Sequence, residues 1–397
     1  MAQLSDRLNR LAPSATLAMS QKSNEMKAQG IDVINMSVGE PDFNTPEHIK
    51  AAGKKAIDDN YSKYSPVPGY LALRNAISDK LDKENHLQYN NKEIIVGTGG
   101  KQGVCNSILA LVNPGDEVII PAPYWVSYPQ MVKLAGGTPV IIRASFEQNF
   151  RITAKQLGEA ITPKTKMLIL CSPSNPTGSV YSQEELNELA KVVLSHEDLF
   201  VLSDEIYEHI NYIGKSASIA SYPGMKERTI ICNGVSKAYA MTGWRLGWVA
   251  APEWIVKGIN KLQGQYTSGT CDVSQMAALA AYQSSQECVE DMRKAFEKRR
   301  DLIVGLAREI PGLEVNVPEG AFYLFPKCSS FFGKSDGKTV ISNSTDFAMY
   351  LLQEGHVATV GGDAFGDPDC FRMSYATSDD NIKEAMRRIK EVTARLK

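Results

Sequence analysis

The sequence lacks long apolar runs, paired cysteines and any marked excess of charge. No run approaches the roughly 20 apolar residues that span a bilayer, and the start, MAQLSDRLNRLAPS, has no apolar core, so we expect neither membrane insertion nor a secretory signal. A net charge of -2 gives no general electrostatic attraction to nucleic acid or anionic membranes. The seven cysteines form no C-x-x-C pair, which is typical of a reducing, cytoplasmic location. The five histidines are dispersed, and we expect no metal site.

Two further absences narrow the function. No G-x-G-x-x-G motif follows the first predicted strand, which argues against a nicotinamide-dependent dehydrogenase on a Rossmann domain. The chain also carries no basic segment that would serve as a DNA-binding module, which argues against a cofactor-binding transcriptional regulator.

What is present is a regular alternation of short apolar runs and helical patterns. A chain of 397 residues is long for one hydrophobic core, so two domains are expected. Six short apolar runs, such as MLIL at 167–170, are typical of strands buried on both faces of a sheet. They lie near residues 93–98, 116–122, 165–171, 199–203, 229–235 and 245–252. Ser182 and Glu185 form a capping-box signature at the start of one predicted helix.

The pattern therefore predicts an α/β protein with a mostly parallel sheet covered by helices. After Ala281 a charged helical stretch, a Gly/Pro-rich passage and a terminal helix predict a smaller C-terminal α/β domain. We expect an N-terminal arm that forms part of the small domain in residues 1–44, a large domain in 45–285, and the small domain in 286–397. The GEPDFNTP stretch reads as a loop between them.

Polar groups follow four of the predicted strands. In sheets of this type the ligand lies beyond the carboxyl ends of the strands, so these groups are expected to converge. They are an amide pocket at Gly99 and Gly100, the amide of Asn175, the carboxylate of Asp204 with Tyr207, and Ser236, Lys237 and Arg245. Taken singly, the Gly-Gly pair and the SNPTG stretch would also suit simple turns.

Pyridoxal phosphate is a cofactor that would use all of these groups. Its aldehyde forms a Schiff base with a lysine, and its ring nitrogen needs a carboxylate to stay protonated. Its phosphate needs amides, a hydroxyl and an arginine.

The motifs themselves resemble those of a known family. SPSNPTG, SDEIYEHI and NGVSKAYAMTGWRLGW are similar to the signatures of fold-type I, class I aminotransferases, and the likeness runs nearly end to end through SVGEPDFNTP, KYSPVPG, GTGGKQ, PYWVSYP and FRMSYA. Among these, the chain resembles the bacterial aspartate aminotransferases that begin with PSAT.

The resemblance implies a cofactor role for each matching residue. Lys237 would be the catalytic lysine, which holds the cofactor and moves the proton between the substrate Cα and the cofactor C4′. Asp204 would pair with the ring nitrogen, and Asn175 and Tyr207 would bind the 3-hydroxyl oxygen. The phosphate would be held by Gly99, Gly100, Ser236 and Arg245, and by Tyr64 from the partner subunit, which implies a homodimer with shared sites. Trp125 would lie over the ring.

The resemblance also implies the substrate contacts. Arg372 would clamp the α-carboxylate as a planar fork, assisted by the main chain near Gly39. Lys101 matches the lysine with which this bacterial subgroup binds the distal carboxylate of aspartate or glutamate. A solvated lysine on the first turn of a helix would be unfavourable with the helix dipole, which favours this role. Trp125, Asn175 and Lys101 would thus face both cofactor and substrate, and Ser14 and Thr16 would close over the site.

The predicted activity is reversible transfer of the amino group from aspartate to 2-oxoglutarate. The same fold leaves open an aminotransferase for alanine, aromatic amino acids or prephenate, or a carbon–sulfur lyase. Some relatives that also use prephenate carry a basic residue just before PSAT; this chain has Ala12 there, which argues against that additional activity. His48 and His209 are predicted to be structural.

Overall fold

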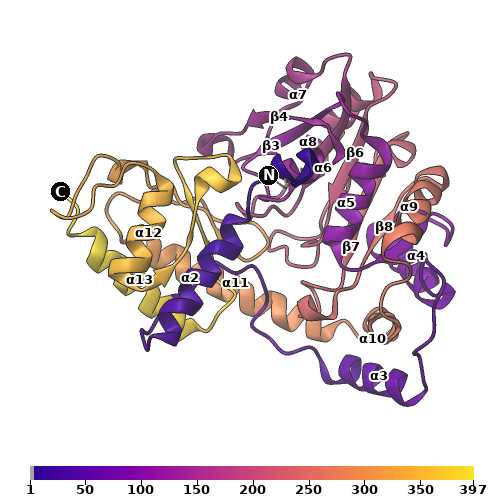
Figure 1. Ribbon diagram of the computed structural model, residues 1–397, viewed down its shortest axis with the longest axis horizontal. Coiled ribbons are helices and arrows are strands. Elements are labelled where there is room, and N and C mark those ends of the chain that lie inside the picture. Colours follow the sequence, from indigo (N-terminus) through magenta and orange to yellow (C-terminus); the bar gives the residue numbers. More distant parts are fainter. Residues whose placement is uncertain (1–3) are drawn as a thin grey trace.

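The larger body of the protein is built on a seven-stranded sheet (Figure 1). The computed structural model describes residues 4–397. The strand order is β2-β8-β7-β6-β5-β3-β4, and β8 alone in this sheet runs antiparallel to its neighbours. The strands are β2 Ile94–Gly97, β3 Glu117–Ala122, β4 Thr138–Arg143, β5 Thr165–Cys171, β6 Phe200–Asp204, β7 Thr229–Gly234 and β8 Gly247–Ala250. The predicted mostly parallel sheet is confirmed.

Burial explains which strands could be predicted from the sequence and which could not. Every residue of β6 and of β7 is buried, and such strands give continuous apolar runs. The strand β4 was not predicted, since it forms an edge of the sheet and most of its residues are partly or fully exposed.

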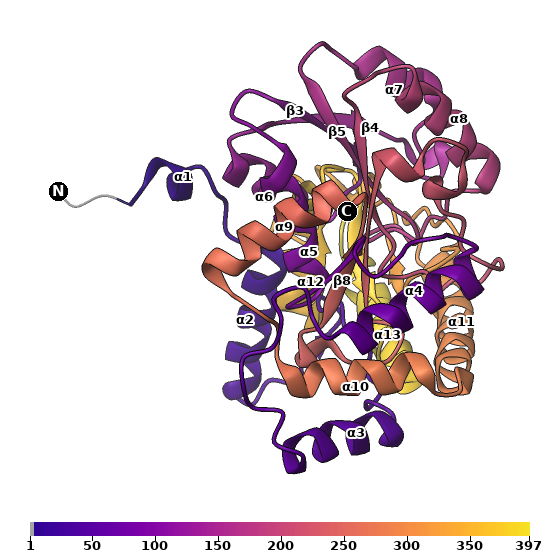
Figure 2. The same cartoon turned by 90° about the vertical axis from the view of Figure 1, so that its right-hand side faces the viewer.

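Helices cover both faces of this sheet. The α-helices of this larger body are α3 Glu47–Asp58, α4 Leu71–Asn85, α5 Gly100–Leu111, α6 Tyr128–Ala135, α7 Ala154–Ala160, α8 Gln183–Leu194, α9 Glu253–Tyr266 and α10 Asp272–Gln283. The predicted capping box is confirmed at α8: Ser182 Oγ accepts from the Glu185 amide and Glu185 Oε2 accepts from the Ser182 amide. Figure 2 shows α3 lying outside α10, against which it packs.

The rest of the chain forms a second, smaller body around short strands. A three-stranded antiparallel sheet has the order β11-β12-β9, and β1 pairs in parallel with β10. The strands are β1 Ile34–Asn35, β9 Tyr323–Leu324, β10 Val357–Ala358, β11 Val360–Gly361 and β12 Phe371–Ser374. The remaining helices are α1 Asp6–Asn9, α2 Ala15–Ala28, α11 Glu287–Arg308, α12 Ser344–Gly355 and α13 Asp379–Thr393.

The pairing of β1 with β10 brings the N-terminal stretch onto the C-terminal part of the chain. Ile34 lies opposite Val357, and both side chains belong to the apolar core of the smaller body. This is the packing expected for the segment before residue 44, while the boundaries at 44 and 285 stay predictions.

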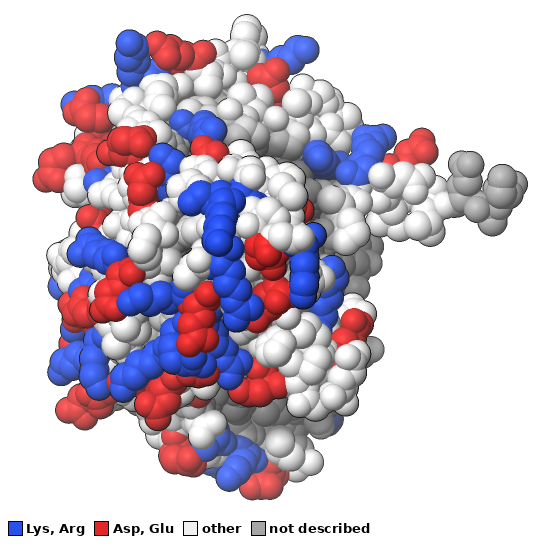
Figure 3. Space-filling model, turned by 90° about the vertical axis from the view of Figure 1, so that its left-hand side faces the viewer, with Lys and Arg blue, Asp and Glu red and all other residues white. Residues whose placement is uncertain are grey.

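The surface carries charges of both signs. In Figure 3, lysine and arginine side chains are interspersed with aspartate and glutamate over the face that is shown. Within residues 4–397, no helix combines the length and the apolar character that a membrane span requires.

Candidate active site

A cavity of about 330 Å³ lies where the carboxyl ends of the central strands meet the smaller body. All but two of the residues that the sequence singled out line it. Those residues are Ser14, Thr16, Gly39, Gly100, Lys101, Trp125, Asn175, Asp204, Tyr207, Ser236, Lys237, Arg245 and Arg372. The strand-end rule therefore located the cavity. The two exceptions are Gly99 and Tyr64.

The start of α5 forms one wall, with features of an anion site. The first amides of a helix have no partner within the helix. Here the N-cap is Gly99, whose φ of 82° suits glycine and which has no side chain to cap these amides. A Cβ at Gly99 would clash with the guanidinium of Arg245, so the missing side chain leaves room for that group. Arg245 Nη1 donates to the Thr242 carbonyl at 2.7 Å. Helix amides and a guanidinium together suit a phosphate.

Asp204 ends β6 as a buried carboxylate. The Tyr128 hydroxyl donates to Asp204 Oδ2 at 2.6 Å, and the Ile206 amide donates to Oδ1 at 3.3 Å. Burial raises the pKa of Asp204, and the hydrogen bond from Tyr128 opposes that rise. A carboxylate kept out of water in this way favours a cationic ligand nearby.

Lys237 follows β7 and reaches across to the N-terminal segment. Its Nζ donates to the Gly39 carbonyl at 2.6 Å. Burial lowers the pKa of Lys237 to about 8, with the carboxylate of Glu40 pulling in the opposite direction. The amine is therefore partly unprotonated near neutral pH, as a nucleophile or proton acceptor requires.

Arg372 lies on β12, with only 2 % of its surface exposed. Its Nη1 donates to Asn175 Oδ1 at 2.8 Å and its Nη2 donates to the Ser37 carbonyl at 2.5 Å. Its Nε is buried without a partner among the described residues, and no carboxylate in that part of the chain pairs with it. Burial lowers the pKa of Arg372. A carboxylate from a ligand would suit such a buried cation.

Lys101 and Trp125 lie together on another wall. Lys101 Nζ is 4.9 Å from the centroid of the Trp125 ring, a cation–π contact. Burial, followed by the charge of Arg245, lowers the pKa of Lys101. Ser14 caps α2 by accepting from the Leu17 amide, so this helix starts at the cavity with Thr16 on its first turn.

Two tyrosines of the site were missed by the sequence reasoning. Tyr128 holds Asp204, and the Tyr323 hydroxyl lies 2.7 Å from that of Tyr207. Both are buried, and nothing in PYWVSYP or GAFYLFPK distinguishes them from core aromatics. The bond of Tyr207 goes to Tyr323 here, so the predicted contact of Tyr207 with a cofactor oxygen stays a prediction.

Tyr64 is fully exposed, and it lies on a different surface from the cavity lining. This placement argues against a role for Tyr64 in the cavity of its own chain. The prediction that it acts from a partner subunit stays a prediction.

The groups of the cavity match the chemistry of pyridoxal phosphate. Helix amides with Arg245 suit the phosphate, buried Asp204 suits a protonated ring nitrogen, and Lys237 suits the aldehyde. Asn175 uses Oδ1 for Arg372, which leaves its Nδ2 group to donate to a ligand.

Comparison with known proteins gives one consistent result. The family model described as "Aminotransferase class I and II" matches residues 31–389. The chain is 48% identical over 399 residues to an aspartate/prephenate aminotransferase of Cereibacter sphaeroides, with 100% of both proteins covered. It is 47% identical to a bifunctional aspartate aminotransferase and glutamate/aspartate-prephenate aminotransferase of Petunia hybrida, covering 99% of this chain and 83% of that protein.

Solved structures agree. The aspartate aminotransferase of Rhizobium meliloti superposes with a TM-score of 0.97 at 43% identity, with 100% of both chains covered. The aspartate aminotransferase of Thermus thermophilus, solved with maleate, superposes with a TM-score of 0.93 at 39% identity, covering 99% of this chain and 100% of that one.

Proposed function

Because this chain belongs to the class I and II aminotransferases, we propose that it is an aspartate aminotransferase that uses pyridoxal phosphate. The observation that carries the proposal is Arg372, which lines the same cavity as Lys237. Its buried guanidinium has neutral oxygens as partners, and its Nε has no partner among residues 4–397. The reaction is reversible: aspartate gives up its amino group and leaves as oxaloacetate, and 2-oxoglutarate takes the amino group and leaves as glutamate.

Lys237 and Asp204 have different roles in the proposed reaction. Bound pyridoxal phosphate supplies an electron sink for breaking the Cα–H bond of the amino acid. Lys237 would accept that proton at Nζ and return it to the cofactor carbon C4′, and its lowered pKa suits this exchange. Asp204, kept in place by Tyr128, would stabilise the positive charge of the ring nitrogen.

The substrate is a dicarboxylate held at both ends. Arg372 binds the α-carboxylate and thereby orients the Cα–H bond toward Lys237. Lys101, whose ammonium group lies over the Trp125 ring, binds the distal carboxylate. The support is that the relatives are named for aspartate and that maleate, present in the Thermus structure, is itself a dicarboxylate.

We further propose a homodimer whose partner supplies Tyr64 to the phosphate. Its full exposure in the single chain supports this, together with an open cavity of about 750 Å³ on the outer side of Arg245, lined by Trp244 and Thr270. Mixing Lys237→Ala with Tyr64→Ala subunits should restore part of the activity that each variant lacks. A cytosolic location stays a prediction from the unpaired cysteines, all seven of which are free thiols.

The test of the proposed function is a pair of measurements on purified protein. Wild-type protein should carry a visible cofactor absorbance band and form oxaloacetate from aspartate and 2-oxoglutarate. Lys237→Ala should lose the turnover and the normal band together. Normal transamination by that variant would show that the assignment is wrong.

A panel of substrates separates the alternatives. Aspartate should be the preferred donor over alanine and the aromatic amino acids. The relatives' names make prephenate the second candidate acceptor, while Ala12, whose amide donates to Gln130 Oε1 at 3.0 Å, stands where a basic residue is expected in prephenate-using enzymes. A carbon–sulfur lyase would instead release a thiol without requiring a 2-oxo acid.

A further inference from the structure

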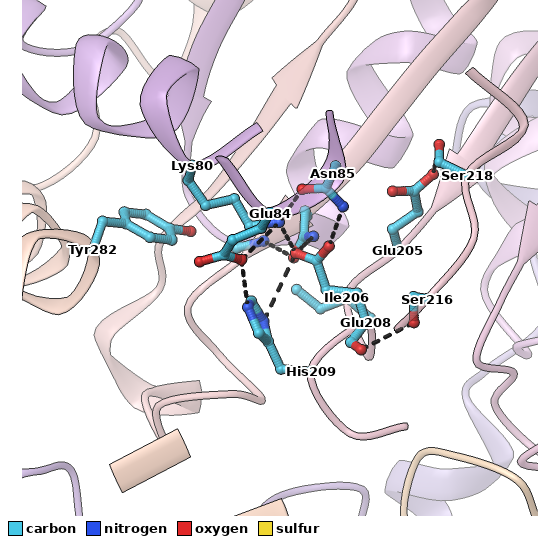
Figure 4. A network of polar contacts seen from close by, with 12 residues as sticks. Lys80, Glu84, Asn85, Glu205, Ile206, Glu208, His209, Ser216, Ser218 and Tyr282 are labelled. Atoms are coloured by element: carbon cyan, nitrogen blue, oxygen red, sulfur yellow. Dashed lines mark hydrogen bonds and ion pairs between the residues drawn. The ribbon is translucent and has the colours of Figure 1, made fainter. Parts of the chain in front are cut away.

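Behind the active site lies a buried ionic network centred on Lys80 and Glu208 (Figure 4). Lys80, on α4, is 5 % exposed, and Glu208, four residues after Asp204, is 8 % exposed. Their side chains form a direct ion pair between segments 128 residues apart in the sequence. Figure 4 shows Lys80, Glu84, Asn85, Glu208 and His209 pointing toward one another.

Glu208 is the hub of this network, because both of its carboxylate oxygens are engaged. Oε1 accepts from Lys80 and from Asn233 Nδ2, the latter at 2.6 Å, and Oε2 accepts from Asn85 Nδ2 at 2.8 Å. Burial alone would raise the pKa of Glu208, but the charges of Lys80 and His209 hold this pKa below its usual range. The carboxylate is therefore a permanent charge with fixed partners.

Glu208 is linked to the cavity in two ways, through the peptide bond to Tyr207 and through the hydrogen bond from Asn233. Glu208 directly follows Tyr207, whose ring lines the cavity. Asn233, the second-last residue of β7, donates to Glu208 and accepts from the Gly234 amide at 2.7 Å through Oδ1. The turn that Asn233 fixes leads within four residues to Lys237. One carboxylate thus connects the segment of Tyr207 with the turn of Lys237 and ties both to α4.

The cluster of Glu84, Glu208 and His209 does not indicate a metal site. Ligand atoms of Glu84, Glu208 and His209 lie within 4.8 Å of one another, but the Lys80 ammonium already contacts both carboxylates. His209 Nε2 lies 2.9 Å from Glu84 Oε2, so the outer part of the cluster is paired as well. The cation of this network is a lysine.

Stability does not explain the network either. A buried ion pair has a desolvation penalty that can exceed its attraction, and an apolar pair of similar volume is often as stable. What such a pair does provide is a fixed geometry with directional partners.

We propose that Glu208 is a positioning residue for the transamination reaction, with Lys80 as its buried counter-ion. Through Asn233 and through the backbone of Tyr207, Glu208 sets where Lys237 stands relative to the cofactor and the substrate Cα. The inference rests on the proposed function, since it concerns the geometry of that same reaction.

Two matched variants test this. Asn233→Ala and Asn85→Ala each remove one amide donor from Glu208, but only Asn233 connects Glu208 to the turn of Lys237. Asn233→Ala should lower kcat roughly 10- to 100-fold, as expected for a displaced catalytic group, and should raise the cofactor dissociation constant of the apoprotein. Asn85→Ala should leave both values close to wild type. Since neither residue contacts Arg372 or Lys101, KM for aspartate should change little.

A double variant that removes both buried charges separates an effect on catalysis from an effect on folding. Lys80→Met with Glu208→Gln removes both charges together, so no charge is left buried without its partner. We expect a folded protein with lowered kcat, weaker cofactor binding and a shifted pH midpoint of the cofactor absorbance. The exposed pair of α9, Lys257→Met with Glu253→Gln, is the control for removing a Lys–Glu pair.

The outcomes are distinct. The proposal is overturned if Asn233→Ala and Asn85→Ala are equal in kcat and in cofactor affinity, or if the folded double variant has wild-type values of both. Cofactor affinity is measured without turnover. Failure of the wild type to transaminate would therefore disprove the proposed function, whereas wild-type behaviour of the variants would disprove only the positioning role.

Discussion

Arg372 and Lys80 are both cations buried almost completely, yet their surroundings differ. Arg372 is 2 % exposed and meets two neutral oxygens, with its Nε unpaired. Lys80 is 5 % exposed and meets the carboxylate of Glu208, with Asn85 Oδ1 at 2.7 Å and Glu84 Oε2 at 3.5 Å. A buried charge without a counter-charge is costly, so a chain tolerates it where a ligand completes it. This difference is what the proposed roles predict: Arg372 would bind a ligand, whereas Lys80 would hold segments of the chain together.

The largest expected effect concerns folding. Lys80→Met should destabilise the ligand-free protein by about 3–5 kcal/mol, because it leaves the Glu208 carboxylate buried without its cation. Arg372→Met should change stability by about 1 kcal/mol or less, because the unpaired Nε and the two hydrogen bonds are lost together. Denaturant unfolding at one protein concentration measures both. Equal losses would remove the distinction between the two cations.

The next effect concerns catalysis. Arg372→Met should lower kcat/KM for aspartate roughly 30- to 5,000-fold, because the substrate carboxylate loses its buried partner. This corresponds to a loss of about 2–5 kcal/mol of transition-state stabilisation. Arg372→Lys should recover only part of the loss, since an ammonium cannot form the planar two-bond contact. Steady-state kinetics with aspartate and 2-oxoglutarate gives the values. Full activity of Arg372→Met would mean that the carboxylate is bound elsewhere.

A smaller effect is expected at Lys101, another cation that lines the cavity. Lys101→Ala should lower kcat/KM for aspartate and glutamate by about tenfold, the order of one charge-assisted hydrogen bond. Activity with alanine, which has no distal carboxylate, should be nearly unchanged. A loss of equal size for alanine would assign Lys101 to the cofactor alone.

The smallest effect is a pH dependence. With a pKa of about 8 for Lys237, recapture of cofactor by the apoprotein should be about fivefold slower at pH 7 than at pH 8 and level off above, because only the free amine reacts. The folded pKa lies below the ordinary value of 10.5, so the unfolded chain binds more protons between pH 8 and 10.5. Stability of the apoprotein due to this group therefore rises with pH in that window and is lost below it. Lys237→Met should abolish this increase.

The sequence predicts the site well where one segment carries its own chemistry. Asp204 and Lys237 each follow an apolar run, Arg245 comes eight residues after Lys237, and the strand-end rule brings the three together without knowledge of the structure. Motif similarity then adds Arg372, which the rule cannot reach because β12 belongs to the smaller body.

Contacts between distant segments could not be read in this way. The Tyr128–Asp204 bond joins residues 76 apart, and the Lys80–Glu208 pair joins residues 128 apart. In the sequence, Lys80 looks like one of the solvated lysines of a helix, and Tyr128 looks like a core aromatic. Burial, which decides both roles, is a property of the packed chain.

One short stretch of main chain has a consequence for sequence variation. The carbonyl of Ser37 accepts from Arg372, and the carbonyl of Gly39 accepts from Lys237. Backbone oxygens are supplied by every residue type, so these two hydrogen bonds do not depend on the side chain of Val38, although that residue also lines the cavity. A side chain at position 39 is excluded, because a Cβ on Gly39 would overlap the Tyr323 hydroxyl. Insertion or deletion of one residue would move one carbonyl away from its cation, so the two cations require a fixed length of this stretch.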